Sequence, residues 1–233
     1  MCTLTWRAVR EGGYDLFFNR DELHVRGAEE PPRLEEIAGL TFAAPRDRDH
    51  QGSWLMLNAR GLTVALLNFY PGGKTGRGLE SRGRLPLACA SCANAQEVSA
   101  VLRAHQLTNF APFHLVAIEA GGSGLSWRWD GDALHEAPAP MFLTSSSFAP
   151  ERVEAARAAR FAELGEVTEE AMRAFHHYHD FDAGAESVCM RRPDACTRSV
   201  CRVRVRSGEA GELVYTPLVW PEGAPGAATT LRV

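Results

Sequence analysis

The hydrophobic positions along the chain fall mostly into short, β-rich runs that are separated by glycine and other turn residues. Residues 2–10 and 14–19 predict two strands, and Gly12-Gly13 between them suits a two-residue hairpin turn. Strands are also expected over 53–58, 62–68, 113–120, 125–129, 141–144, 187–190, 199–205 and 212–220.

Helical patterns are fewer, and they are expected over 86–92, 95–106, 150–164 and 168–178. Pro150 suits a first helical turn, and Thr168 is a good N-cap. The order is strands, helices, strands, helices, strands, without regular βαβ alternation. This order favours a single α+β domain over residues 1–233, with antiparallel sheets and helices on their outer faces.

Composition narrows the class of protein without changing this picture. Hydrophobic residues make up 45% of the chain and charged residues 23%, which are ordinary globular values. The formal net charge of −4 gives no global basic field, so no nucleic-acid partner is expected. No run of about 18 apolar residues predicts a membrane span. Six cysteines without a visible secretion signal predict reduced thiols and a cytoplasmic protein.

Cys2 is the first candidate for chemistry. A small second residue normally permits removal of Met1, which would leave a thiol and a free α-amine on the same residue. The amine, with an ordinary pKa of about 7.7–8, could then act as the base for that thiol. The alternative is that Cys2 is an ordinary residue of the first strand.

The predicted first hairpin brings a polar run close to Cys2. With a two-residue loop Cys2 faces Leu23, and a loop longer by one or two residues would place it opposite Glu22 or Asp21. The polar run 19–22 ends the second predicted strand, so the antiparallel pairing of the hairpin places it beside the start of the chain. It is either a solvated strand end or part of a site at Cys2.

Several short motifs together identify a family resemblance. They are Met1-Cys2, Asn19-Arg20-Asp21-Glu22, Gly52-Ser53-Trp54-Leu55, Asn68 and Ser81-Arg82-Gly83. With them the chain resembles the NRDE family, which includes the transport-and-Golgi-organisation proteins and many bacterial members. That family is similar to N-terminal-nucleophile (Ntn) hydrolases of the choloylglycine hydrolase and penicillin acyltransferase types. The resemblance is strongest over 1–85 and implies an αββα four-layer sandwich, two antiparallel sheets between helical layers.

The resemblance also implies roles for individual residues. Cys2 would be the nucleophile and its own amine the base, Asp21 would hold that amine, and Asn68 would donate to an oxyanion. Successive strand residues point to opposite faces, so Arg20 and Asp21 are not expected to face Cys2 together. Asn19 and Asp21 share a face and are the expected pair, which leaves Arg20 as a structural member of the site.

Substrate-binding roles are implied for Trp54, Arg82, Ser145 and Arg198. Two positions depart from the family pattern. Phe18 stands where choloylglycine-type enzymes carry an arginine, and Ser145 stands where relatives carry an asparagine. Because one missing oxyanion donor can cost about 10²–10³ in rate, activity is a weaker expectation than fold.

Two other kinds of site are suggested by short motifs in the sequence. Residues 68–75 are similar to a phosphate-binding loop, but they lack its first glycine and a following helix. His176 and His179 could share a helix face near cysteines, but no second paired motif has structural-zinc spacing. We therefore expect no metal and no cofactor.

The sequence thus predicts an N-terminal cysteine amidohydrolase or acyltransferase that acts on a small amide. The alternative is a non-catalytic binding or trafficking protein for a hydrophobic metabolite, haem or an acyl ligand. In both hypotheses the partner is a small molecule.

Overall fold

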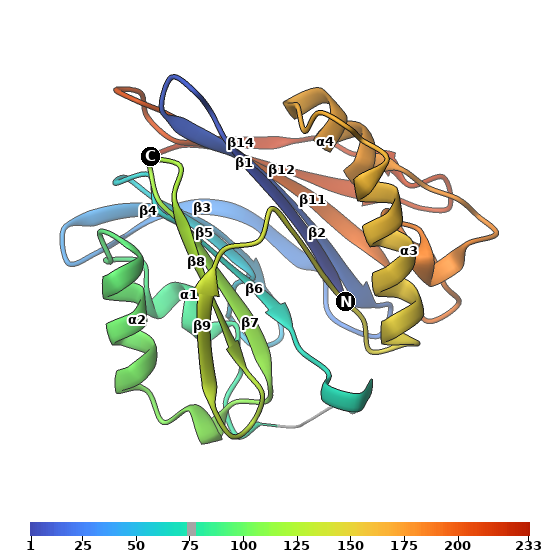
Figure 1. The fold of residues 1–233 in the computed structure, drawn as a ribbon, viewed down its shortest axis with the longest axis horizontal. Helices are drawn as coiled ribbons and strands as arrows, with labels where there is room; N and C mark the ends of the chain where they lie inside the picture. Colours follow the sequence, from blue (N-terminus) through green and yellow to red (C-terminus); the bar gives the residue numbers. More distant parts are fainter. Residues whose placement is uncertain (74–77) are drawn as a thin grey trace.

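The protein consists of two seven-stranded antiparallel sheets packed face to face and covered by helices on both outer sides (Figure 1). The computed structural model describes residues 1–73 and 78–233. The α+β four-layer architecture expected from the family resemblance is confirmed.

The first sheet has the strand order β10-β1-β2-β11-β12-β13, and β14 also pairs with β12. Its strands are β1 (Cys2–Ala8), β2 (Gly13–Leu23), β10 (Phe142–Ser145), β11 (Ala195–Arg206), β12 (Glu212–Val219), β13 (Ala224–Pro225) and β14 (Thr229–Arg232). Because β1 lies between β10 and β2, the start of the chain is flanked by a strand on each side.

The second sheet is a meander in which neighbours in sequence are neighbours in space. Its strands are β3 (Glu29–Ile37), β4 (Leu40–Asp47), β5 (Leu55–Asn58), β6 (Thr63–Asn68), β7 (Phe113–Ile118), β8 (Gly124–Trp129) and β9 (Leu134–Pro138). The expected hairpin over 53–68 is confirmed, with Gly61 in a positive-φ turn between β5 and β6.

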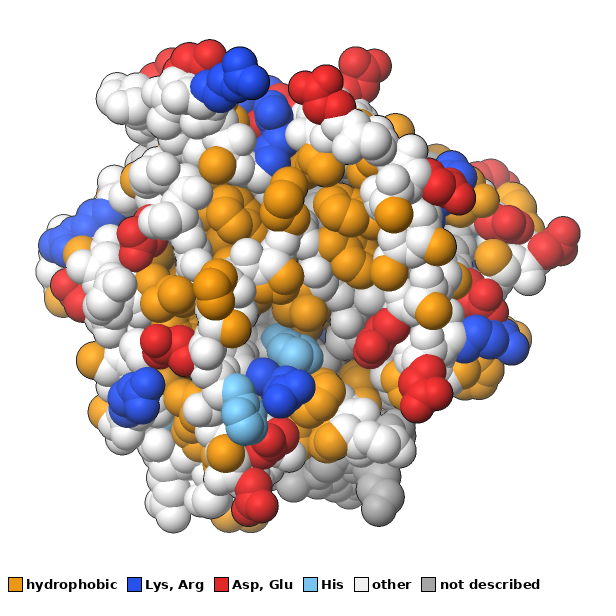
Figure 2. All heavy atoms as spheres, in the orientation of Figure 1, with side chains coloured by type: hydrophobic (Ala, Val, Ile, Leu, Met, Phe, Trp, Pro, Cys, Tyr) orange, Lys and Arg blue, Asp and Glu red, His pale blue; other side chains and the backbone are white. Residues whose placement is uncertain are grey.

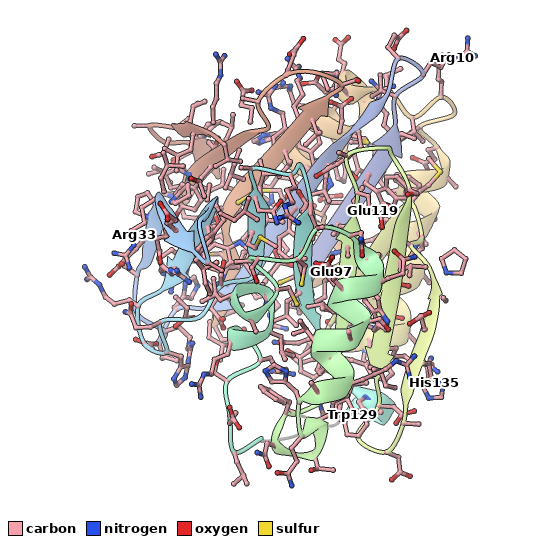
Figure 3. The ribbon with its side chains drawn as sticks, turned by 90° about the vertical axis from the view of Figure 1, so that its left-hand side faces the viewer. Arg10, Arg33, Glu97, Glu119, Trp129 and His135 are labelled. Carbon is pink, nitrogen blue, oxygen red and sulfur yellow. The ribbon has the colours of Figure 1, made fainter. Side chains whose placement is uncertain are left out.

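Two pairs of helices form the outer layers. The second sheet is covered by α1 (Arg84–Ala88) and α2 (Ala95–Ala104), and Figure 3 views the molecule from this side. The first sheet is covered by α3 (Pro150–Ala162) and α4 (Glu169–His177). Short 3-10 turns are η1 (Pro71–Gly73), η2 (Leu107–Asn109) and η3 (Gly184–Glu186).

The central core fills the space between the sheets. Leu4, Leu16 and Phe18 from the first sheet meet Leu55 and Val116 from the second, and all are fully buried. Burying each such side chain contributes roughly 1.5–3 kcal/mol. The positions that alternate with these on β1 and β2 face α3 and α4 instead, so each face of the first sheet has its own set of residues.

The β1–β2 hairpin differs from its prediction. Its loop has three residues, Arg10-Glu11-Gly12, because Val9 and Gly13 still pair and the Gly12 amide donates to the Val9 carbonyl at 3.0 Å. Gly12 has a φ of +91°, which suits the left-handed position that closes a three-residue hairpin loop. The register therefore moves, and Cys2 faces Arg20 rather than Leu23 or either alternative.

Other elements differ from their prediction because tertiary contacts, which a local sequence pattern does not show, decide where they begin and end. The polar run 19–22 is not a solvated strand end, because β2 continues to Leu23 and Asn19, Arg20 and Asp21 are buried. The segment 187–190 is not a strand. The first helix begins and ends earlier than expected, at Arg84 and Ala88.

Candidate active site

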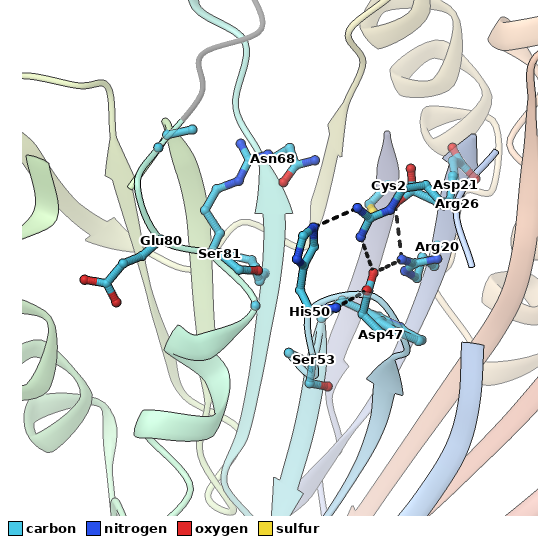
Figure 4. A pocket seen from close by; sticks show the side chains of 18 of the residues that line it. Cys2, Arg20, Asp21, Arg26, Asp47, His50, Ser53, Asn68, Glu80 and Ser81 are labelled. Carbon is cyan, nitrogen blue, oxygen red and sulfur yellow. Dashed lines mark hydrogen bonds and ion pairs between the residues drawn. The ribbon is translucent and has the colours of Figure 1, made fainter. Parts of the chain in front are cut away.

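A pocket of about 480 Å³ opens at the start of β1 (Figure 4). The first sheet contributes Cys2 and Arg20 to it, and the second contributes Asn68 at the end of β6. The loops 47–54 and 78–83 supply most of the remaining wall. Residues distant in sequence therefore meet at one end of the sandwich, with the Cys2 thiol among them.

Arg20 is a charged side chain on the same face as Cys2. Its guanidinium donates to Glu29 at 2.7 Å, to Asp47 at 2.8 Å and to Glu22 at 3.1 Å. It also lies over the Trp54 ring, 4.5 Å from the ring centroid. These contacts fix a buried cation beside the thiol.

Met1 occupies the strand position next to Cys2. Its terminal amine donates to the Asp21 carbonyl at 3.3 Å, and the Asp21 amide donates to the Met1 carbonyl at 3.1 Å. The Met1 side chain packs against Met190. Burial raises the pKa of the Cys2 thiol to about 11, although the terminal amine and Arg20 both act to lower it. With Met1 in place, the thiol is therefore neutral near pH 7.

The side chains of Asp21 and Asn19 lie on the opposite face of β2, so the expectation that this pair faces Cys2 is wrong. The Asp21 carboxylate accepts from Arg157 at 3.1 Å and from the Thr197 hydroxyl at 2.6 Å. The three-residue loop is the reason, because it puts even-numbered residues of β2 on the face of Cys2.

The Asn19 side chain makes its hydrogen bonds on the face of the first sheet that packs against α4. Its amide nitrogen donates to the His176 carbonyl at 2.8 Å, and its oxygen lies 2.7 Å from His176 Nδ1. His176 Nε2 lies 2.8 Å from the Thr5 hydroxyl. Burial, with the nearby charges of His177 and Arg157, keeps the pKa of His176 well below its ordinary value. His176 is thus a neutral structural residue that attaches α4 to the sheet.

Ser145 and Asn68 lie on different sides of Cys2. Ser145 is the register partner of Cys2 on β10, and its buried hydroxyl has no hydrogen-bond partner among the residues that the structure describes. Asn68 lines the pocket, where its amide donates to the Tyr70 hydroxyl at 3.0 Å. Both remain candidates for contact with a reacting group.

Of the four residues expected to bind substrate, the structure brings Trp54 and Arg82 into the pocket. Ser145 lies next to Cys2 but is not part of the pocket lining. Arg198 is not brought there, because its guanidinium donates to the carbonyls of Leu23 at 2.8 Å and Arg26 at 3.1 Å. It holds the chain where β2 ends, so its substrate-binding role is not supported by the pocket.

Comparison with known proteins now identifies the family. The family model described as Transport and Golgi organisation 2 matches residues 1–154. The chain belongs to this family. No curated protein matches the sequence.

Solved structures with the same fold are Ntn hydrolases. A conjugated bile acid hydrolase mutant from Clostridium perfringens has a TM-score of 0.57 at 13% identity, covering 100% of this chain and 92% of its own. A Caenorhabditis elegans N-acylethanolamine-hydrolyzing acid amidase ortholog has a TM-score of 0.60 at 12% identity, covering 87% and 92%. Penicillin V acylase from Agrobacterium tumefaciens has a TM-score of 0.57 at 13% identity, covering 99% and 86%. At these identities the likeness is one of fold.

Two glycines of the family motifs form the floor of this family member's pocket. A Cβ atom on Gly52 would lie 2.8 Å from the Gly83 Cα, and a Cβ on Gly83 would lie 3.0 Å from the Gly52 Cα. The Ser53 amide donates to the Gly83 carbonyl at 2.8 Å. The motifs Gly-Ser-Trp-Leu and Ser-Arg-Gly are thus two backbones in direct contact.

Sequence reasoning missed Arg157, which is fully buried in α3 and binds Asp21, the Thr3 hydroxyl at 2.7 Å and the Ala185 carbonyl at 2.9 Å. The spacing of residues along the predicted helix does indicate that Arg157 is buried. Val153 and Arg157 are four residues apart, so an arginine lies on the apolar stripe of a predicted helix. A charge at such a position requires a partner.

The sequence also offered two competing kinds of site, a metal centre and a phosphate-binding loop. Within residues 1–73 and 78–233, no group of three or more His, Cys, Asp or Glu side chains could hold a metal ion. Lys74 and Thr75 of the loop similar to a phosphate-binding loop lie outside the described residues. All six cysteines are free and buried. In the described part, no helix is long and apolar enough to cross a membrane.

Proposed function

We propose that this protein is an N-terminal cysteine amidohydrolase or acyltransferase that acts on a small amide after removal of Met1. The observation that carries the proposal is the position of Cys2, at a pocket of about 480 Å³ with the Arg20 guanidinium on the same face. The fold relatives whose names include bile acid hydrolase, acid amidase and acylase support the same reaction class.

In the proposed reaction the free amine of Cys2 accepts the thiol proton. The sulfur then forms a bond to the carbonyl carbon of the substrate amide, and negative charge develops on the carbonyl oxygen. As the C–N bond breaks, the leaving amine takes the proton and a thioester remains on Cys2. Water, or a second amine in an acyltransferase, then forms a bond to the thioester carbonyl carbon. The C–S bond breaks to release the acid or the new amide, and the proton lost by the attacking group passes to the sulfur.

Several groups are suited to this sequence. Arg20 favours the thiolate because its charge lowers the pKa of Cys2. Removal of Met1 would free the Asp21 backbone amide and carbonyl, which both bind Met1. Asn68 and Ser145 could donate hydrogen bonds to the developing oxyanion. Asp21 would then act through its backbone, while its carboxylate anchors the strand to α3.

A second candidate, non-catalytic binding of a hydrophobic metabolite, haem or an acyl ligand, is favoured by apolar surface near the site. Figure 2 shows hydrophobic side chains gathered in a hollow between the second sheet and α3. A second pocket of about 510 Å³ is lined partly by Phe69, Tyr70 and Pro150. The Tyr70 hydroxyl bonds Asn68, so the two pockets are neighbours. A cytoplasmic location remains a prediction in either case.

Intact-mass measurement combined with thiol labelling tests the proposal. We expect the purified chain to begin at Cys2, and iodoacetamide to label Cys2 before the five other thiols near pH 7. A chain that retains Met1 should instead show a thiol pKa of about 11, so its Cys2 labelling rate should rise about tenfold per pH unit from 7 to 10.

Two controls make the result decisive. Cys196→Ser should leave the labelling rate of Cys2 unchanged, and Cys2→Ser should abolish the fast phase. If nearly all molecules retain Met1, no free amine is available on Cys2, which contradicts catalysis and supports the binding function.

A further inference from the structure

The acidic side chains that line the pocket already have partners. Glu22 and Asp47 both accept from Arg20, and the second Glu22 oxygen accepts from the Leu23 amide at 2.9 Å. Glu80 accepts from Arg84 at 3.0 Å and, through its other oxygen, from an asparagine at 3.0 Å. The pocket therefore offers little free negative charge for a cationic ligand.

The arginines of the pocket differ in this respect. Arg26 is paired with Asp47 at 2.7 Å and with Asp49 at 3.4 Å. Among the residues that the structure describes, Arg82 has no carboxylate within 4.0 Å, and its one hydrogen bond is from Nη1 to the Pro112 carbonyl at 2.7 Å. Its Nε and Nη2 have no protein partner in that part of the chain, and the side chain is half-buried in the pocket wall.

The surroundings of Arg82 disfavour an unpaired positive charge on its guanidinium. Burial lowers the pKa of Arg82, and the neighbouring Tyr70, Cys2 and Glu22 only partly oppose this effect. Arg82 and Cys2 line the same pocket, so the guanidinium and the thiol can contact one bound molecule. A half-buried cation with no carboxylate partner among the described residues loses hydration that its hydrogen bond to the Pro112 carbonyl restores only in part, so it favours an anionic ligand.

We propose that the amide substrate carries a carboxylate, and that Arg82 binds this carboxylate while Cys2 faces the amide carbonyl. The planar guanidinium has two unused nitrogens, Nε and Nη2, which match the two oxygens of a carboxylate. The inference rests on the proposed function, because it requires Cys2 to be the reacting group. It adds the chemical class of the substrate.

Two alkylating reagents that differ in charge test this inference on the chain that begins at Cys2. Iodoacetate and iodoacetamide both transfer a CH₂ group to the thiolate, forming an S–C bond as the C–I bond breaks and iodide leaves. We expect the ratio of the iodoacetate rate to the iodoacetamide rate at Cys2 to exceed the ratio for free cysteine by about tenfold. Taking the ratio cancels changes in the thiolate fraction.

Variants assign the effect to one side chain. Arg82→Gln should reduce the ratio to that of free cysteine, and Arg82→Lys should retain part of the preference. Arg103→Gln is the matched control, because it removes the same charge from an arginine that lies outside the pocket and is paired with Glu136 at 3.4 Å. It should change the ratio by less than about twofold.

The outcomes separate the two proposals. If Cys2 reacts rapidly with iodoacetamide but the ratio equals that of free cysteine, or is unaffected by Arg82→Gln, the carboxylate inference is overturned and the proposed nucleophile stands. If neither reagent labels Cys2, the proposed function fails and this inference fails with it.

Discussion

Asp21 and Arg157 form an ion pair in which both side chains are fully buried. Arg157 reaches from α3 to the sheet, and Thr197 supplies a second hydrogen bond to the Asp21 carboxylate. The pair therefore joins the helical layer to the strand whose other face carries Arg20. Burying two charges is costly, and removing one partner leaves the other without compensation.

Asp21→Asn should destabilise the protein by roughly 3–5 kcal/mol, because the Arg157 charge would remain buried. Urea denaturation measures the change. The double variant Asp21→Asn/Arg157→Met should be more stable than the single variant, since it removes the stranded charge. Glu163→Gln, at an exposed pair with Arg160, is the control and should stay within about 0.5 kcal/mol. A double variant no more stable than Asp21→Asn would contradict this account.

Among the elements, the contact between the loops 47–54 and 78–83 shapes the pocket floor. Gly52 precedes β5 and Gly83 precedes α1, and their backbones touch where any side chain would collide. The contact sets how closely the two loops approach, and hence the position of Arg82 beside Gly83.

Gly52→Ala should lower the free energy of unfolding by about 1–3 kcal/mol, because its Cβ would lie 2.8 Å from backbone atoms of Gly83. Gly121→Ala is the matched control, since a Cβ there would meet nothing within 4 Å. Urea melts followed by far-UV circular dichroism compare the two. Equal stability of the two variants would show that the loops can separate at no cost.

Elements defined by local signals were predictable. Pro150 and the Thr168 cap mark helix starts that the structure confirms, with the Thr168 hydroxyl accepting from the Ala171 amide at 3.1 Å. Of the predicted site residues, the structure brings Cys2, Arg20 and Asn68 to one pocket, and their roles stay a prediction. The face of β2 that meets Cys2 was predicted wrongly, because Gly12 closes a longer loop than Gly12-Gly13 suggested. That choice depends on backbone conformation, and one change of loop length moved every side chain of β2 relative to Cys2.

Other parts of the fold depend on distant partners. The strand β3, with the sequence EEPPRLEEI, has no hydrophobic alternation and was not predicted. It forms because β4 supplies its hydrogen-bond partners and because Glu29 accepts from Arg20, the Ser199 hydroxyl and the Tyr215 hydroxyl. The role of Arg157 was likewise not predicted, because α3 and β2 are distant in sequence and only the folded structure brings Arg157 to Asp21.

At the scale of the whole molecule, polar contacts as well as apolar packing join the two sheets. The Tyr14 hydroxyl on β2 donates to the Gly61 carbonyl at 2.9 Å and lies 2.7 Å from the Thr63 hydroxyl on β6. All of these groups are buried between the sheets. The two sheets should therefore unfold together.

Tyr14→Phe should lower the free energy of unfolding by about 1–3 kcal/mol, because the Gly61 and Thr63 groups would lose their buried partner. Tyr178→Phe is the control, since its hydroxyl makes no hydrogen bond among the described residues, and it should be nearly neutral. Urea transitions followed by tryptophan fluorescence and by circular dichroism should coincide in both variants. Separate transitions would show that the sheets unfold independently.

The outer position of β3 also affects how molecules behave in concentrated solution. An uncovered strand edge is a template on which a strand of another molecule can add, which is how edge-to-edge aggregation begins. Here the edge carries Pro31 and Pro32 and a register irregularity between Glu30 and Arg33, and charged residues flank them. Proline offers no amide hydrogen to an incoming strand, and the glutamates repel a second copy of the same edge. The same prolines and charges that make this strand hard to predict from sequence thus disfavour the addition of a strand from another molecule at the β3 edge of the second sheet.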